Sequence, residues 1–202
     1  VTPIARRQAL LRWAEDTGST IIEDDYDSEF RYKGKPIPAL QGMDQTGSVV
    51  YMGTFSKAIA PAIRVGYMVL PESLLSVYRK KGRFYSSTVS RVDQRILANF
   101  ISGGYFERHL NRMREIYKGK HDVLLGALKP LEKRFEIKGE YAGLHVLLTD
   151  RKGEAEQALL AKAEEKKVRV YGLSGFCMEE RRAKESHTIV LGYAGLTEEE
   201  IR

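Results

Sequence analysis

In the first part of the chain, a stretch with apolar residues at helical spacing is followed by short, continuous apolar runs. Apolar residues recur at helical spacing within residues 4–16, which predicts an amphipathic helix. Short apolar runs follow at residues 19–25, 49–53 and 64–71, and each has the length of a strand. This alternation predicts an α/β fold whose sheet is buried on both faces.

The middle of the chain has a helical pattern, with breaks at Gly82 and at Gly103 and Gly104. Residues 105–131 form one amphipathic stretch with apolar residues at helical steps. A helix of about 27 residues would be about 40 Å long, which is longer than a small domain is wide. We therefore expect this helix to join two lobes.

The last third predicts a second, smaller α/β lobe. Strands are expected in "RFEIKG", "GLHVLLT", "VRVYG" and "HTIVLGYAG", with a helix at residues 154–166. Thr197 and Glu200 have the spacing of a capping box, which opens a further helix. The first helix lacks the preceding strand that a doubly wound sheet would normally supply, so we expect the chain to be a fragment.

Composition narrows the class of protein. The chain has 202 residues, is 43% hydrophobic and carries a net charge of +6, with both signs mixed along its helices. The charge therefore indicates a solvated surface, although a nucleic acid or anionic ligand would also fit. A single cysteine, no apolar run of about 20 residues and no leader favour a cytoplasmic protein without membrane spans. Four widely separated histidines predict no metal site.

Chemically versatile side chains follow two of the predicted strands. The run "EDDYD" at residues 23–27 ends one strand, and Thr54, Ser56 and Lys57 follow the next, with Arg64 shortly after. Open α/β sheets bind ligands at the carboxyl ends of their strands. A lysine, a carboxylate, a phenol, hydroxyls and a guanidinium suit a phosphorylated pyridine aldehyde.

Several longer motifs resemble one protein family. "TFSKAIAPAIRVGY" is similar to the lysine motif of fold-type I pyridoxal-phosphate (PLP) enzymes, the aspartate aminotransferase superfamily. Together with "IIEDDYDSEFRY", "VDQRILANFISGGYFERHLNRMREIY", "AGLHVLL" and "VLGYAGLTEEE", it resembles the aminotransferase-like domain of MocR/GabR-type regulators, within the GntR family. The resemblance covers essentially the whole chain. It implies an aminotransferase-like α/β fold of type I, with the C-terminal half of the large PLP-binding domain at residues 1–103. The linking helix and the small domain would then occupy residues 104–202.

The resemblance also implies roles for individual residues. Lys57 matches the lysine that forms the imine with PLP, and Asp24 matches the aspartate that pairs with the pyridinium nitrogen. Tyr26 matches the tyrosine on the ring oxygen. The phosphate-binding residues correspond to Thr54, Ser56 and Arg64.

A MocR/GabR-type domain would act as a sensor in transcription regulation. An amino acid or amine effector would form an external aldimine at Lys57 and so control DNA binding by an N-terminal winged-helix domain that this chain lacks. A fragment of this kind leaves strand edges and apolar faces open, so we expect a homodimer, with exchange of an identical element between the two copies as one way to form it. The carboxylate-binding arginine of aminotransferases is missing near Leu191, Gly192 and Tyr193, and Gly175 replaces an arginine of the GABA-responsive regulator. We therefore expect weak transamination at most.

Alternatives remain open from the sequence. Lys57 could be an ordinary lysine at a helix start, Asp24 a turn cap like Asp25 or Asp27, Tyr26 a core residue, and Arg64 an ion-pair partner of Asp24. His145 fits a structural strand position better than a catalytic one. The chain could instead come from a genuine class I aminotransferase, or be a basic nucleic-acid-binding module without a cofactor.

Overall fold

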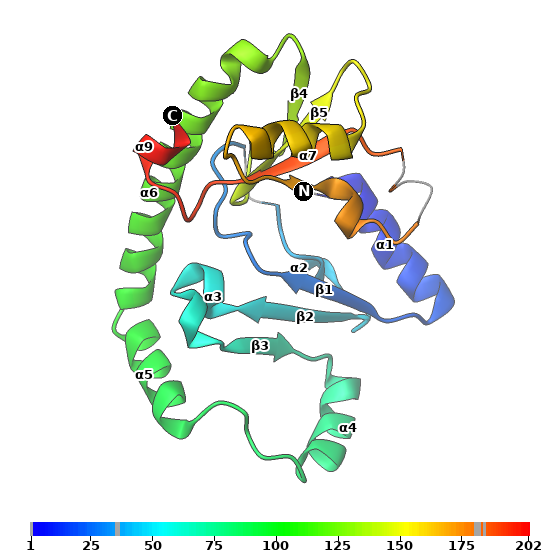
Figure 1. The fold of residues 1–202 in the computed structure, drawn as a ribbon. Coiled ribbons are helices and arrows are strands. Elements are labelled where there is room, and N and C mark those ends of the chain that lie inside the picture. The colour runs from blue at the N-terminus through cyan, green and yellow to red at the C-terminus, as the bar shows by residue number, and fades with distance from the viewer. Residues whose placement is uncertain (1, 35–36, 180–182, 184) are drawn as a thin grey trace. The chain divides into compact units, whose positions relative to one another are not determined.

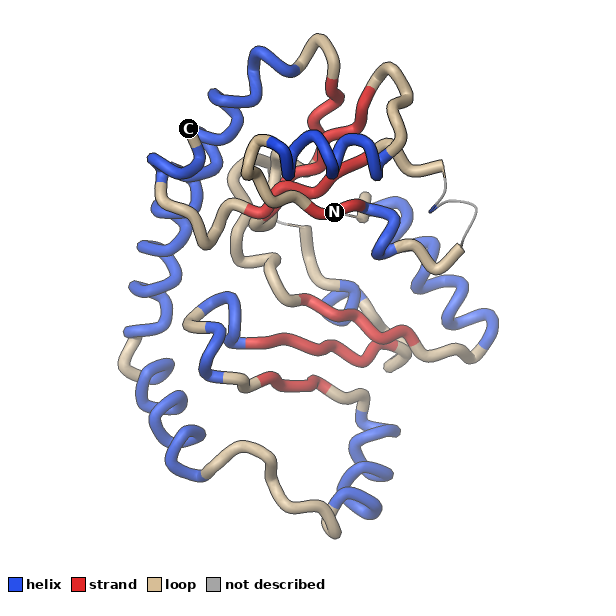
Figure 2. The backbone as a smooth tube through the Cα atoms, viewed as in Figure 1, coloured by secondary structure: helices blue, strands red, loops and turns tan. Residues whose placement is uncertain are grey.

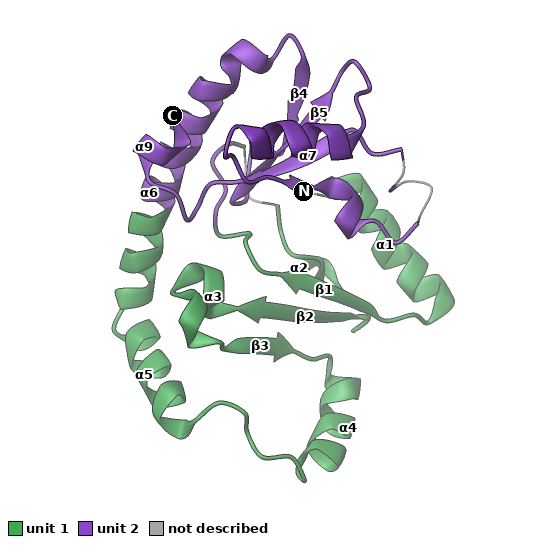
Figure 3. Ribbon diagram, in the orientation of Figure 1, with its two compact units in different colours: residues 1–29, 34–113 green, residues 30–33, 114–202 purple. Residues whose placement is uncertain are grey.

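The computed structural model describes residues 2–34, 37–179, 183 and 185–202. Figure 3 divides the chain into two compact units. Unit 1 comprises residues 1–29 and 34–113, and unit 2 comprises residues 30–33 and 114–202. Helix α6 (Tyr105–Leu128) contributes residues to both units. The expected domain boundary after residue 103 stays a prediction, because compactness within this chain does not define the domains of a complete protein.

Unit 1 is built on a three-stranded mixed sheet in the order β1-β2-β3, seen in Figure 1. The strands are β1 (Ile21–Asp25), β2 (Val49–Thr54) and β3 (Gly66–Val69). β1 runs parallel to β2 with Ile21 opposite Val49, and β3 runs antiparallel to β2 with Gly66 opposite Thr54. All three strands lie in apolar runs of the sequence, so their prediction is confirmed.

The helices of unit 1 begin and end at recognisable signals. They are α1 (Ile4–Thr17), α2 (Leu40–Met43), α3 (Phe55–Ala58), a 3₁₀ turn (Pro61–Ile63), α4 (Glu72–Gly82) and α5 (Arg91–Ser102). Gly18 ends α1 in the left-handed conformation at φ 64°. The Ser90 side chain accepts a hydrogen bond from the Asp93 backbone N–H and caps α5. The predicted break at Gly82 is confirmed by the end of α4.

The expectation that the sheet is buried on both faces was wrong for the described chain. Alternate residues of a strand point to opposite faces, and one face of this sheet carries exposed apolar side chains. Ile22, Met52 and Met68 are 67%, 37% and 52% exposed. The apolar runs correctly identify strands, but they do not supply the layer that would cover this face.

Unit 2 contains a four-stranded antiparallel sheet in the order β4-β5-β7-β6. Its strands are β4 (Phe135–Lys138), β5 (His145–Asp150), β6 (Tyr171–Gly172) and β7 (Thr188–Gly192). Its helices include α7 (Glu156–Glu165) and α9 (Glu198–Ile201). Strands of both units are coloured red in Figure 2. Buried apolar residues from α6, α7 and the sheet form one core: Leu124, Leu128, Phe135, Val146, Leu148, Leu159, Ile189 and Tyr193.

The long helix predicted after Gly104 is α6 (Tyr105–Leu128), with 24 residues. It follows the expected break at Gly103 and Gly104, where Gly104 adopts φ 67°. The α-helix ends before the predicted residue 131 because a 3₁₀ turn containing Pro130 occupies Lys129–Leu131. The capping box of Thr197 and Glu200 is confirmed at the start of α9.

Within the described residues, none of the helices has both the length and the apolar composition needed to cross a bilayer. The same residues contain no cluster of three or more histidine, cysteine or acidic side chains that could bind a metal ion.

Candidate functional site

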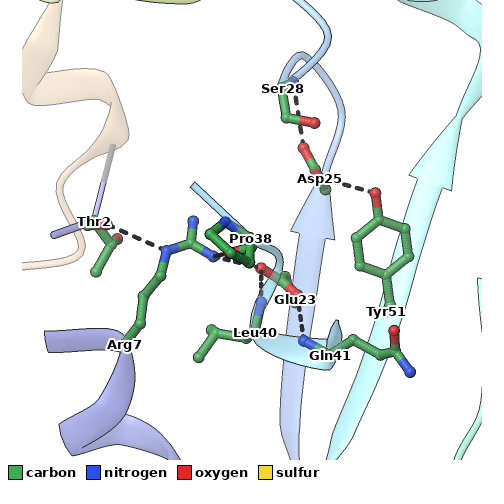
Figure 4. Close-up of polar contacts among 9 residues, drawn as sticks. All are labelled: Thr2, Arg7, Glu23, Asp25, Ser28, Pro38, Leu40, Gln41 and Tyr51. Carbon is green, nitrogen blue, oxygen red and sulfur yellow. Dashed lines mark hydrogen bonds and ion pairs between the residues drawn. The ribbon is translucent and has the colours of Figure 1, made fainter. Parts of the chain in front are cut away.

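The acidic run at the end of β1 separates into side chains on two faces of the sheet. Glu23 and Asp25 lie on one partly buried face, whereas Asp24 lies between them on the exposed face. The Glu23 carboxylate accepts hydrogen bonds from the backbone N–H groups of Leu40 and Gln41, at 2.8 and 3.0 Å. Figure 4 shows these contacts at the start of α2. Glu23 therefore connects β1 to the next helix.

Arg7 of α1 completes the contacts of Glu23. Its Nη1 atom donates to Glu23 Oε1 at 3.0 Å and to the Pro38 carbonyl oxygen at 3.0 Å. Only 15% of the Arg7 side chain and 10% of the Glu23 side chain are exposed. This charge-assisted contact connects α1, β1 and the segment before α2.

Asp25 has a second set of contacts on the same face. Its Oδ2 atom accepts a hydrogen bond from the Tyr51 hydroxyl of β2 at 2.9 Å, and its Oδ1 atom accepts one from the Ser28 backbone N–H at 3.3 Å. Burial raises the pKa of the Tyr51 phenol, and the hydrogen bond to Asp25 raises it further. Tyr51 therefore stays protonated and keeps its donor directed at Asp25.

Asp24 and Tyr26 remain available for a ligand. Both are exposed, and Tyr26 is 44% exposed. Within the described part of the chain, Asp24 has no hydrogen bond or ion pair with another side chain. Burial raises the pKa of the Tyr26 phenol, and the carboxylates of Asp27 and Asp24 raise it further. The phenol therefore keeps a proton that it can donate to an acceptor on a ligand.

The lysine motif forms the short helix α3, directly after β2. The Thr54 hydroxyl donates to the Val65 carbonyl oxygen at 3.2 Å and accepts from the Ser56 backbone N–H at 3.1 Å. Thr54 is thus the N-cap of α3, and its hydroxyl donor is already used inside the protein. Its predicted contact with a phosphate stays a prediction. Ser56 is partly exposed and Lys57 is exposed.

Arg64 follows the 3₁₀ turn in an unusual backbone conformation. Its φ of 49° and ψ of 35° are left-handed, a region that residues other than glycine rarely occupy. Its side chain is exposed, and no ion pair joins it to Asp24 in the described residues. Strained backbone of this kind is concentrated at binding and catalytic sites.

The strand register brings the predicted site residues to one end of the sheet. Asp24 lies opposite Met52, two residues before Thr54, and the strands that carry Asp24 and Thr54 are parallel. Gly53 allows the Tyr67 ring of β3 to lie directly over β2, because a Cβ atom at Gly53 would be 2.5 Å from the Tyr67 hydroxyl. Near this end of the sheet, the arrangement leaves four exposed side chains: the acid Asp24, the phenol Tyr26, Lys57 and Arg64.

The residues singled out in the last lobe have different surroundings. Tyr193 is buried in unit 2, and its hydroxyl donates to the Gly143 carbonyl oxygen at 2.7 Å. It is a core residue of unit 2. His145 and Gly175 are exposed. The contacts of Arg7, Glu23 and Tyr51 were not predicted from the sequence. The one available signal was the alternation of side chains along β1, which places neighbouring acids on opposite faces of the sheet.

Comparisons with known proteins give consistent matches. Residues 2–202 match the family described as aminotransferase class I and II. The chain is 42% identical to the HTH-type transcriptional regulator YhdI of Bacillus subtilis (strain 168), over 100% of this chain and 43% of that protein. It is 34% identical to the probable rhizopine catabolism regulatory protein MocR of Rhizobium meliloti, over 97% of this chain and 39% of that protein.

A solved structure matches over the whole chain as well. The multiple substrate aminotransferase of Thermococcus profundus superposes with a TM-score of 0.85 at 28% identity, covering 100% of this chain and 50% of that one. The chain therefore spans half or less of the length of these proteins.

Proposed function

Because this chain belongs to the aminotransferase class I and II family, we propose that it is part of the PLP-binding, effector-sensing domain of a MocR/GabR-type transcriptional regulator. The main support is the combination of a free Asp24 and an exposed Lys57 at the same end of the sheet, in a chain similar to HTH-type regulators along its length. The regulator would work in the cytoplasm as a homodimer.

The described residues fit PLP. Aminotransferases of this fold type use PLP, which supplies an electron sink when bound. Asp24 would pair with the ring nitrogen, since no side chain of the described residues already satisfies its carboxylate. Tyr26 would donate to the ring oxygen. Lys57 would be the covalent attachment point, and Arg64 and Ser56 would bind the phosphate.

An amino acid or amine effector would compete with Lys57 for the cofactor. The domain would have two conformations. Release of the lysine would favour one of them and so shift the equilibrium between the two. DNA contact would come from a winged-helix domain outside this chain. This part of the proposal draws on the similarity to HTH-type regulators and to MocR.

A genuine aminotransferase is the second candidate. The match to the Thermococcus profundus aminotransferase, with a TM-score of 0.85, favours it. The absence of an arginine at Leu191–Tyr193 favours the sensor, because a charge-assisted contact with a substrate carboxylate contributes about 1.5–3 kcal/mol.

The experiment compares Lys57→Ala with Lys81→Ala in the full-length protein. Lys81 is an exposed lysine of α4 and serves as the control. We expect Lys57→Ala to abolish the visible absorbance band of lysine-bound PLP and the borohydride-reduced adduct, while Lys81→Ala keeps both. An adduct on another lysine would overturn the site. Sustained turnover of amino acids at about 1–1000 per second would favour the enzyme.

A further inference from the structure

The face of β1 opposite Asp24 contains a pair of side chains that the proposed function does not use. Asp25 and Tyr51 come from neighbouring parallel strands, and Figure 4 shows their side chains directed at one another. The Tyr51 hydroxyl donates to Asp25 Oδ2 at 2.9 Å. Because successive side chains of a strand point to opposite faces, Asp25 cannot share the open face of Asp24.

The second oxygen of Asp25 closes the turn after β1. Oδ1 accepts the Ser28 backbone N–H at 3.3 Å, so the turn between them includes Tyr26 and Asp27. One carboxylate therefore fixes two things at once. It holds the end of β1 against β2, and it holds the backbone that carries Tyr26.

We propose that Asp25 and Tyr51 are positioning residues, whose hydrogen bond sets the orientation of Asp24 and Tyr26 toward the PLP ring. The inference rests on the proposed function, since it assigns the ring to the open face of β1. Glu23, two residues before Asp25 in β1, makes a similar connection through Arg7 and the start of α2. Of the three successive acids of β1, Glu23 and Asp25 thus hold the scaffold, and Asp24 meets the ligand.

The test uses Tyr51→Phe, Asp25→Ala and the double variant in the full-length protein. Tyr51→Phe keeps the ring and removes only the hydroxyl. We expect Tyr51→Phe, which removes one hydrogen bond, to weaken PLP binding roughly three- to tenfold. Asp25→Ala also removes the hydrogen bond to the Ser28 backbone and should weaken PLP binding at least as much. The double variant should bind no more weakly than Asp25→Ala, because Asp25→Ala already removes the contact that Tyr51→Phe removes. At saturating PLP, the pH midpoint of the visible band should shift in all three.

Two further measurements separate positioning from general stability. Thr197→Ala removes the N-cap of α9 and so lowers the stability of the protein without changing β1 or β2. It should therefore leave PLP affinity and the pH midpoint unchanged. In the protein without PLP, amide hydrogen exchange at Ser28 should become faster in Tyr51→Phe than in the wild type.

The outcomes distinguish the two proposals. Normal PLP affinity and an unchanged pH midpoint in Tyr51→Phe, or fully additive losses in the double variant, overturn the positioning role and leave the proposed function intact. A wild-type protein that binds no PLP through Lys57 overturns the proposed function, and the positioning role with it.

Discussion

At the scale of single residues, Arg64 combines a strained backbone with an exposed guanidinium. Its left-handed conformation costs a side chain with a Cβ atom roughly 1–2 kcal/mol. Glycine adopts this conformation without that strain but gains chain entropy on unfolding. The structure therefore allows the backbone role of residue 64 to be separated from its side-chain role.

We predict that Arg64→Gly keeps the free energy of unfolding within about 1 kcal/mol of wild type, because relieved strain and added chain entropy oppose each other. PLP affinity should fall roughly ten- to a hundredfold through loss of a charge-assisted phosphate contact. Thermal unfolding and PLP titration measure the two effects. Arg64→Ala is the control: it loses the same affinity but retains the strain. Unchanged affinity in both variants would exclude the phosphate role.

At the scale of elements, the start of α7 depends on one buried acid. Glu156 is 4% exposed and accepts hydrogen bonds from the Ser174 backbone N–H at 3.0 Å and from the hydroxyls of Ser174 and Ser186. Burial would raise the pKa of Glu156, but these hydrogen bonds outweigh burial and lower it. Gly172 of β6 lies directly beside it, and a Cβ atom there would force the Glu156 carboxylate to shift from its hydrogen-bond partners. The carboxylate thus connects α7 to the 3₁₀ turn after β6 (Leu173–Phe176) and to the segment before β7.

We predict that Glu156→Gln lowers the free energy of unfolding by about 1.5–3 kcal/mol near neutral pH. The pKa of Glu156 is lower in the folded than in the unfolded state. Its stabilisation is therefore present above the unfolded value, about 4.3, and is lost as the pH falls through the folded value. Denaturant unfolding from pH 7 to pH 3 should show the two proteins converging in acid. Glu165→Gln, at the exposed end of the same helix, should match wild type throughout. A difference that persists unchanged at pH 3 would contradict this account.

At the scale of the whole molecule, the open face of the β1-β2-β3 sheet determines how the chain behaves in isolation. Ile22 and Met68 are more than half exposed on this face, and apolar surface of this kind favours association. We predict that the isolated 202-residue chain forms dimers or larger species in sedimentation experiments. Ile22→Lys combined with Met68→Lys should shift it toward monomer.

Val168→Lys provides the matched control for this prediction. Val168 is 52% exposed in unit 2, and changing it should leave the association unaltered. A wild-type chain that sediments as a single monomeric species would show that the exposed face does not drive association.

The sequence by itself determined the class of fold, the positions of most elements and the family. Apolar periodicity located the strands that became β1, β2, β3, β4, β5 and β7, because the alternation or continuity of apolar residues is a local property of each strand's sequence. The motifs around Lys57 and Asp24 indicated the aminotransferase-like fold and the MocR-type relatives, and the comparisons confirm both. The cofactor roles of Asp24, Tyr26, Thr54, Ser56, Lys57 and Arg64 stay predictions.

Only the tertiary structure decided which of Glu23, Asp24 and Asp25 lacks a side-chain partner among the described residues. Glu23, Asp24 and Asp25 are equivalent as local sequence, since each is an acid at the end of an apolar run. The pairing of β1 with β2 and the start of α2 then supplied partners for two of them. Those partners lie 17 and 26 residues away along the chain. A local sequence pattern does not show which distant residues will become neighbours. The different contacts of Glu23, Asp24 and Asp25 therefore follow from tertiary packing alone.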